Sequence, residues 1–199
     1  MKIKFYYGLS GCLKGTTIQA TEKDSLVMPS SIKNWKHYQD GLFNGMMQYD
    51  DLVYSILHFV RFEEFIKGGY GKDLVVERGI TDSLFYRVYN DEYVRHKENP
   101  DLILESVQTE TSLIPFGYEI EKVLLIQRDI DFVANTVLKD PYRNKTFKGD
   151  PELYMDLQNK YIEWTMAYNQ INRAIEINDA KTYIEEVLGI KYFNPIKSV

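Results

Sequence analysis

The fold is decided by residues 3–17, which read IKFYYGLSGCLKGTT. The first five of these residues, Ile3 to Tyr7, form a β-branched and aromatic run that ends at Gly8. Such a run predicts a buried strand that enters a turn. A helical stretch then begins near Gly15 and extends to Lys23. Because the run is almost continuously apolar instead of alternating, it is typical of a strand that is covered on both faces of a parallel sheet.

Four more short apolar runs follow the first one, with helical stretches between them. The runs lie at residues 25–28, 74–76, 123–126 and 174–177. The helical stretches lie at residues 15–23, 38–67, 83–107 in pieces, 131–138, 151–167 and 182–188. Strands that alternate with helices predict an α/β fold of three layers, αβα, with a five-stranded parallel sheet in the middle. No internal repeat and no linker divides the chain, so we expect residues 1–199 to form a single domain.

Composition restricts the class of protein. Hydrophobic residues make up 44% of the 199 residues and charged residues 27%, which excludes disordered and low-complexity classes. Lys and Arg number 24 against 29 Asp and Glu, and the resulting net charge of −5 disfavours wrapping of nucleic acid. No apolar run has the roughly 18 residues that a membrane helix needs, and no secretory signal opens the chain, so we expect a cytoplasmic protein. The single cysteine, Cys12, excludes an internal disulfide.

The turn after the first strand has the composition of a phosphate-binding loop. Its glycines let backbone N–H groups surround an anion, the following helix adds its positive end, and Lys14 adds a full charge. The strict pattern G-x-x-x-x-G-K-[ST] is not met, because Leu13 replaces the second glycine and Gly15 replaces the hydroxyl residue. A plain glycine-rich turn with an exposed lysine is the alternative. The candidate phosphate-binding residues are Gly8, Ser10, Gly11, Cys12, Leu13, Lys14, Gly15, Thr16 and Thr17.

Two motifs resemble those of P-loop nucleoside and nucleotide kinases. The loop has the form GxxGxxKGT, which is similar to the loop of nucleoside monophosphate kinases. Residues 75–87, VVERGITDSLFYR, resemble the D-R-Y-x-x-S-S-x-A-Y-Q segment of thymidylate kinases and the E-R-S segment of deoxynucleoside kinases. Glu77 and Arg78 match both. The resemblance implies a P-loop NTPase fold with ATP and Mg²⁺ as cofactors, Thr16 or water on the metal, and Arg78 on a phosphate, with Glu77 either orienting Arg78 or assisting the metal.

The same resemblance suggests a substrate pocket and a lid. Trp35 is similar to the pocket tryptophan of deoxynucleoside kinases, and Tyr54 and Phe59 are candidates to line a base pocket, with core packing as the alternative. Residues 138–150 are rich in cations and resemble the lid that brings positive charge, here from Arg143, to the transferring phosphate. The glutamate that accepts the sugar hydroxyl proton in deoxynucleoside kinases has no match here. This favours an acceptor that is already phosphorylated.

These observations lead to the hypothesis of phosphoryl transfer from ATP to a nucleoside monophosphate of the deoxypyrimidine class, such as thymidylate. Lys14, Glu77, Arg78 and Arg143 are the catalytic candidates, and Arg78 is also a candidate to contact substrate. Three alternatives stay open. They are a deoxynucleoside kinase, a kinase that acts on a modified base or hydroxyl in DNA, and a protein with a degenerate loop that binds nucleotide without catalysis. We expect a small-molecule acceptor and a homodimer, with nucleic acid disfavoured as a partner and no membrane association.

Overall fold

The computed structural model describes residues 1–28, 50–89 and 100–192. The chain packs as two compact units. The first contains Met1–Phe5 and Ser25–Glu121, and the second contains Tyr6–Asp24 and Lys122–Val199. No helix within the described ranges is long and apolar enough to span a membrane. The expectation of a single domain stays a prediction.

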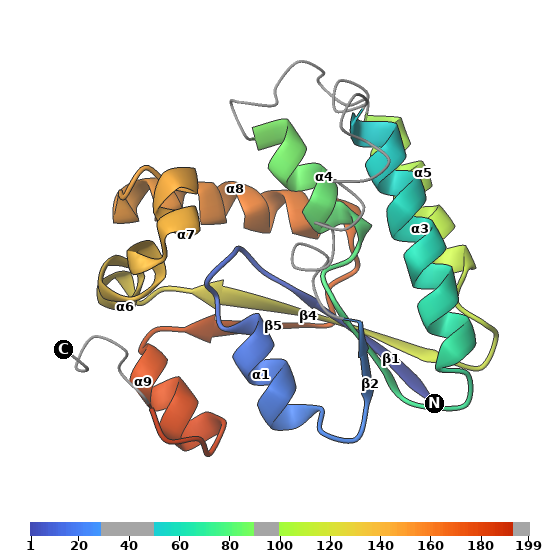
Figure 1. Cartoon of the computed structure of the whole chain (residues 1–199), viewed down its shortest axis with the longest axis horizontal. Coiled ribbons are helices and arrows are strands. Elements are labelled where there is room, and N and C mark those ends of the chain that lie inside the picture. The colour runs from blue at the N-terminus through green and yellow to red at the C-terminus, as the bar shows by residue number, and fades with distance from the viewer. Residues whose placement is uncertain (29–49, 90–99, 193–199) are drawn as a thin grey trace. The chain divides into compact units, whose positions relative to one another are not determined.

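Five strands form one parallel sheet in the order β2-β3-β1-β4-β5 (Figure 1). They are β1 (Lys2–Tyr7), β2 (Leu26–Met28), β3 (Leu74–Glu77), β4 (Glu119–Gln127) and β5 (Arg173–Ile177). In the register of the outer pairs, Leu26 of β2 lies opposite Leu74 of β3, and Gln127 of β4 lies opposite Ile177 of β5. Each predicted strand is present. The predicted α/β fold, with helices flanking a five-stranded parallel sheet, is therefore confirmed.

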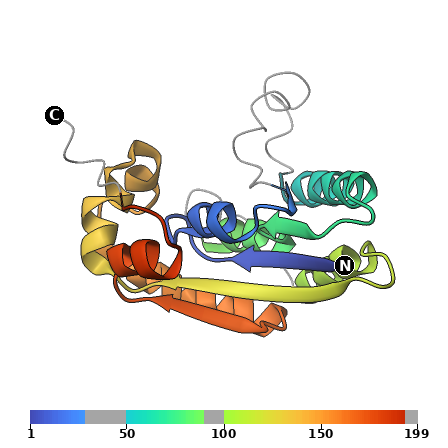
Figure 2. The same ribbon diagram turned by 90° about the horizontal axis from the view of Figure 1, so that it is seen from below.

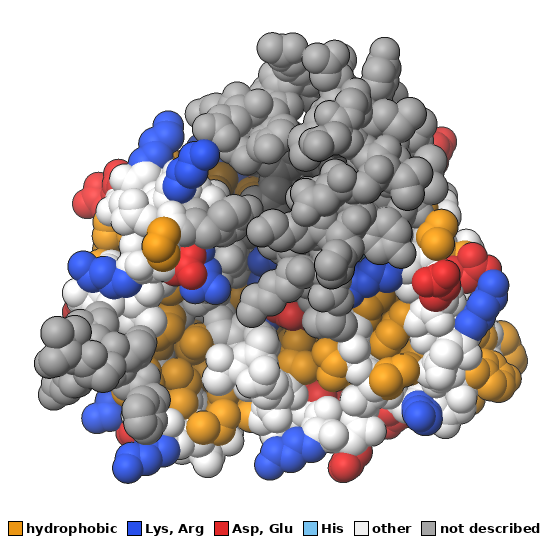
Figure 3. All heavy atoms as spheres, viewed as in Figure 1, with side chains coloured by type: hydrophobic (Ala, Val, Ile, Leu, Met, Phe, Trp, Pro, Cys, Tyr) orange, Lys and Arg blue, Asp and Glu red, His pale blue; other side chains and the backbone are white. Residues whose placement is uncertain are grey.

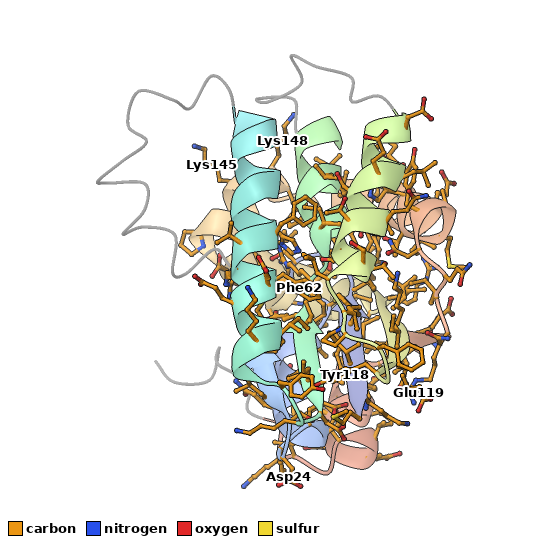
Figure 4. All side chains as sticks on the ribbon, turned by 90° about the vertical axis from the view of Figure 1, so that its right-hand side faces the viewer. Asp24, Phe62, Tyr118, Glu119, Lys145 and Lys148 are labelled. Carbon is orange, nitrogen blue, oxygen red and sulfur yellow. The ribbon has the colours of Figure 1, made fainter. Side chains whose placement is uncertain are left out.

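Three helices of the first unit pack against one another. They are α3 (Asp50–Gly68), α4 (Ile80–Tyr89) and α5 (Pro100–Ser112), and Figure 1 shows α3 and α5 side by side. Phe62 points inward from α3 (Figure 4) and is fully buried, with its ring centroid 5.9 Å from that of Phe5 on β1. The Tyr118 hydroxyl accepts a hydrogen bond from the Gly71 N–H at 3.2 Å, near the end of α3. Aromatic side chains thus supply much of this core.

The second unit surrounds β4 and β5 with short helices. α1 and α9 lie on one side of β4, and α8 lies on the other (Figure 2). The Thr17 hydroxyl on α1 lies 3.0 Å from the Tyr183 hydroxyl, which joins α1 to the turn that continues α9. The helices are α1 (Lys14–Thr21), α6 (Ile130–Asn135), a 3₁₀ turn (Val137–Lys139), α7 (Pro141–Thr146), α8 (Pro151–Tyr168), α9 (Ala180–Thr182) and a π-helical turn (Tyr183–Val187).

The segment predicted as a lid, residues 138–150, contains a helix that our sequence analysis does not predict. α7 begins at Pro141 because the Asp140 carboxylate accepts the Arg143 N–H at 3.0 Å. Asp at the cap and Pro in the first turn are both favourable for a helix start. The Asp140-Pro141 pair was therefore a local signal for α7, even though the helix is too short to show periodicity.

Candidate functional site

The glycine-rich loop follows the carboxyl end of the central strand, β1. On one side of β1 lie β2 and β3, and on the other lie β4 and β5. The chain therefore changes direction along the sheet at β1, and ligands of open α/β sheets bind at such switch points, beyond the carboxyl ends of the strands. The loop and the end of β4 both belong to the second unit.

Two glycines fix the path of the loop. Gly8 has φ +149°, and a Cβ there would lie 2.7 Å from the Leu125 carbonyl oxygen of β4. Gly11 has φ +95°, and its Cβ would lie 2.5 Å from a methyl carbon of Val137. Any side chain at either position would force backbone or packed atoms apart. The predicted role of these glycines in shaping the turn thus has a steric basis.

Leu13 adopts the left-handed conformation that a glycine would adopt more easily. Its φ is 66° and its ψ is 17°, and it precedes the first residue of α1. The left-handed region costs a non-glycine residue about 1 kcal/mol or more. The position where the usual motif has glycine therefore has a glycine-like backbone here, despite its leucine side chain.

Lys14 is buried inside its own loop. Only 4% of its surface is exposed, and its ammonium group donates hydrogen bonds to the Gly8 carbonyl oxygen and to the Leu9 carbonyl oxygen at 3.2 Å. The Cys12 sulfur lies 3.6 Å from the same nitrogen. Cys12 is itself buried. A buried ammonium group that is held by main-chain carbonyls is a concentrated positive charge, already desolvated, at the end of β1.

The two threonines of the loop have different environments. The Thr17 hydroxyl donates to the Leu13 carbonyl at 3.0 Å and contacts the Tyr183 hydroxyl. Burial raises the pKa of Tyr183 above its usual value, so this phenol remains protonated. Thr17 is thereby engaged in packing α1 against Tyr183. Thr16 is half-buried in the first turn of α1. Of the two threonines, Thr16 is therefore the candidate for a metal contact.

Residues far from the loop in sequence support it. The Tyr161 hydroxyl of α8 accepts a hydrogen bond from the Gly8 N–H at 2.8 Å, although 153 positions separate the two residues. The Gln158 side-chain oxygen accepts the Gln127 N–H at 2.8 Å, and its amide group donates to the Gln127 carbonyl. Both contacts fix strand ends around the loop. No local sequence pattern identifies either partner.

Asp129 holds two helix starts together just after β4. Its Oδ1 accepts the Phe132 N–H of α6 at 2.8 Å, and its Oδ2 accepts the Ala180 N–H of α9 at 2.9 Å. A carboxylate at the positive end of a helix is stabilising. One side chain thus couples the segment after β4 to the segment after β5.

Arg143 connects α7 to the loop. Its Nε–H donates to the Ser10 hydroxyl at 3.2 Å, so the guanidinium group lies within the loop's own neighbourhood. Basic side chains gather over α7 (Figure 3), and Lys145 and Lys148 extend outward from it and from the residues that follow (Figure 4). The structure therefore brings together Ser10, Lys14 and Arg143, which are three of the residues singled out from sequence.

The predicted acid-arginine pair lies at the end of β3, in the first unit. Glu77 is the last residue of β3, and Arg78 follows it with φ 78°. The Arg78 Nε lies 4.0 Å from Oδ2 of Asp82, a carboxylate with no exposed surface in the first turn of α4. Sequence reasoning assigned the orienting acid to Glu77, and it missed Asp82.

The three predicted pocket residues are resolved to different degrees. Trp35 lies outside the described residues. Tyr54 lies on α3, with its side chain outside the described part. Phe59 is half-buried on α3, with its ring centroid 6.0 Å from that of the buried His58. The assignment of all three to a base pocket stays a prediction.

The donor set around the loop is suited by chemistry to phosphate oxygens and not to a cage for a metal ion. Lys14, Arg143 and the N–H groups of the loop are phosphate donors by chemistry. Within residues 1–28, 50–89 and 100–192, no three His, Cys, Asp or Glu side chains group so as to hold a metal ion. Mg²⁺ usually keeps several waters and binds through substrate phosphates, so a single hydroxyl such as that of Thr16 is compatible with it.

Comparison with known proteins supports the fold. The chain resembles the crystal structure of "a putative kinase" from Chloroflexus aurantiacus J-10-fl, with a TM-score of 0.53 and 12% sequence identity. The match covers 94% of this chain and 92% of the other. No protein-family model matches the chain, and no curated protein matches it significantly. At this identity, the likeness shows a shared α/β fold over almost the whole length of both chains.

Proposed function

We propose that this protein transfers the γ-phosphoryl group of ATP to a nucleoside monophosphate of the deoxypyrimidine class. The observation that carries the proposal is the Lys14 ammonium group, which is buried in a glycine-rich loop at the end of the central strand. The whole-length likeness to a structure described as a kinase supports phosphoryl transfer in general, and the motif resemblance suggests the acceptor.

In this proposal the chain's residues position and neutralise phosphate. Lys14 exchanges its main-chain carbonyl partners for oxygens of the β- and γ-phosphates, and N–H groups of residues 10–16 surround the β-phosphate. The Arg143 guanidinium group exchanges its hydrogen bond with the Ser10 hydroxyl for contacts with the phosphoryl group that is transferred. ATP supplies the activated phosphoryl group, and Mg²⁺ neutralises charge on it. Positioning and electrostatics account for most of the catalysis in such a site.

We assign a phosphorylated acceptor because of the positive charge of Arg78. A guanidinium group such as that of Arg78 binds phosphate oxygens through two parallel hydrogen bonds, which favours a phosphorylated acceptor. A monophosphate is also an anionic nucleophile already, so it needs orientation more than a general base. This agrees with the lack of a match to the glutamate that deoxynucleoside kinases use.

One observation favours a second candidate, which is nucleotide binding without catalysis. Leu13 places a bulky side chain where the usual loop has glycine, and Gly15 removes the usual hydroxyl group beside the metal. Such a loop would still attract a polyphosphate through Lys14, but it would position the metal less well.

The test is a screen of the purified protein with ATP and Mg²⁺ against common nucleosides and their monophosphates, with product mass as the readout. We expect the largest turnover with a deoxypyrimidine monophosphate. Lys14→Ala should lower kcat/KM by about 10²–10³-fold, since it removes a preorganised charge from the transition state. Lys23→Ala, which removes an exposed charge just after α1, is the matched control and should leave turnover unchanged.

The outcomes separate the two candidates. Binding of ATP without product from any acceptor would point to the non-catalytic protein. Product from a free nucleoside alone would replace the monophosphate with a nucleoside as acceptor. Unchanged turnover of Lys14→Ala would remove Lys14 from the mechanism.

A further inference from the structure

The turn after β3 is held in a strained conformation. Arg78 has φ 78°, in the left-handed region that an arginine rarely adopts. Strain of this kind persists only where the surrounding structure imposes it. The residues that impose it here are therefore of interest for any function of Arg78.

A buried carboxylate from α5 anchors the turn. Glu110 is only 2% exposed, and its Oε1 accepts the N–H of Ile80, the first residue of α4, at 2.9 Å. The same oxygen forms a hydrogen bond of 2.6 Å with Nε2 of His58 on α3. His58 is buried as well, and its ring stacks on that of Phe62 with centroids 6.2 Å apart. Glu110 therefore joins three helices at a point two residues after Arg78.

The arrangement has consequences for anion binding. The Glu110 carboxylate at the N-terminus of α4 accepts one N–H of the helix start and complements the positive end of that helix. The guanidinium group of Arg78 is then the cationic group of this turn. Asp82, fully buried, lies 4.0 Å from its Nε and faces the side chain, while Glu110 fixes the backbone.

Packing alone does not require such a pair. Burying a carboxylate with a histidine carries a desolvation cost, and well-packed apolar side chains of similar volume are often equally stable. We propose that Glu110, supported by His58, is a positioning residue that holds Arg78 in its strained conformation for binding of the acceptor phosphate. The positioning role rests on the proposed function, whereas the anchoring of the turn does not.

The anchor is tested first, without any activity assay. Hydrogen exchange followed by mass spectrometry should show faster exchange in the peptide that contains Ile80 for Glu110→Ala and for His58→Phe, with residues 8–17 unchanged. Glu110→Gln keeps an oxygen that accepts the Ile80 N–H and should exchange like the wild type. Glu105→Ala removes an exposed carboxylate from the same helix and serves as the control. Unchanged exchange at Ile80 in both Glu110→Ala and His58→Phe would overturn the anchor.

The positioning role is tested by a double-mutant cycle on kcat/KM for the acceptor. Glu110→Ala should lower kcat/KM by about tenfold to a hundredfold, mainly through the acceptor KM, because a displaced Arg78 binds phosphate poorly. In an Arg78→Ala background the same change should cost less than about twofold, since coupled residues are not additive. Glu110→Gln should recover most of the activity.

Each outcome has one meaning. Equal losses from Glu110→Ala with and without Arg78 would overturn the positioning role. If Glu110→Ala does not fold, His58→Phe takes its place in the cycle with the same expectation. If the wild type transfers phosphate to no acceptor, the proposed function fails, while the exchange measurement still decides whether Glu110 anchors the turn.

Discussion

Single residues decide the shape of the glycine-rich loop through their backbone angles. Gly8 and Gly11 have no room for a side chain. Leu13 and Arg78 are not glycines but have positive φ; Leu13 directly precedes Lys14, and Arg78 is itself a residue that our proposals use. Strained backbone concentrates where geometry matters for function. The backbone at these two positions is therefore a functional candidate alongside the charged side chains.

The strain at Leu13 predicts an unusual order of stabilities. Leu13→Gly and Leu13→Ala both remove the side chain, but only glycine adopts φ 66° without steric cost. Leu13→Gly should therefore be more stable than Leu13→Ala by about 1 kcal/mol. Urea unfolding measures the difference. At the exposed helical residue Gln19 the order should be reversed, with alanine about 1 kcal/mol better than glycine. The same order at both positions would contradict the left-handed assignment.

Elements support the site by meeting at strand ends. α8 contributes Tyr161 and Gln158, which fix Gly8 and the end of β4, and Asp129 fixes the starts of α6 and α9. These contacts hold backbone groups at the edge of the sheet where ligands bind. A change in one helix is thus expected to affect the loop in another element.

Tyr161→Phe should show this effect. It leaves the Gly8 N–H buried without its hydroxyl acceptor, which costs about 1–3 kcal/mol of stability. ATP binding should weaken as well, because the loop loses a fixed point. Urea unfolding and titration calorimetry measure the two effects. Tyr168→Phe, on the same helix, is the control. Equal effects of the two substitutions would argue against a special contact at Gly8.

The cap at the start of α9 predicts that the stability of the folded protein depends on pH. The backbone N–H of Thr182 donates to the Asp179 carboxylate at 2.6 Å and holds the pKa of that group below its usual value. Folding therefore favours the charged form, so the capping contribution is present above the unfolded pKa and is lost as pH falls through the lower folded pKa.

Asp179→Ala should accordingly lower the urea midpoint at pH 7, and the difference from the wild type should shrink below about pH 4. Glu186→Ala, one turn later, is the control and should change the midpoint less. If the difference in urea midpoint between Asp179→Ala and the wild type stays constant from pH 7 to pH 2, the ionisation of Asp179 does not contribute to stability.

At the scale of the whole molecule, buried phenols link stability to alkaline pH. Burial, reinforced by the hydrogen bond that the Tyr6 hydroxyl donates to Glu22 at 2.6 Å, raises the pKa of Tyr6 far above its usual range. Burial also raises the pKa of Tyr183. The folded state thus retains protons that the unfolded chain releases near pH 10, and stability falls as pH rises above about 10.

The measurement is the urea midpoint between pH 8 and pH 11. We expect a decline above about pH 10 for the wild type. Tyr6→Phe should start from a lower midpoint at pH 8 and should decline less steeply. If the urea midpoint of Tyr6→Phe declines with pH as steeply as that of the wild type, Tyr6 has the same pKa in the folded and unfolded states.

The order and type of the main elements follow from local patterns in the sequence. Continuous apolar runs at residues 3–7 and 123–126 predict buried parallel strands, because both faces of such strands need apolar side chains. The sequence also predicted the loop glycines and Lys14 as residues of the candidate site, because a turn between a strand and a helix restricts which residues can occupy it. Local rules of this kind need no knowledge of distant residues.

Which distant groups meet depends on the tertiary packing of the chain. The contacts of Tyr161 with Gly8 and of Glu110 with Ile80 join residues 153 and 30 positions apart, and no local pattern encodes them. β4 begins at Glu119, earlier than its apolar run, because the Glu119 N–H bonds to the Met1 carbonyl at 3.0 Å. Main-chain hydrogen bonding and burial are satisfied by whichever groups the packed chain brings near, so these contacts depend on the fold as a whole.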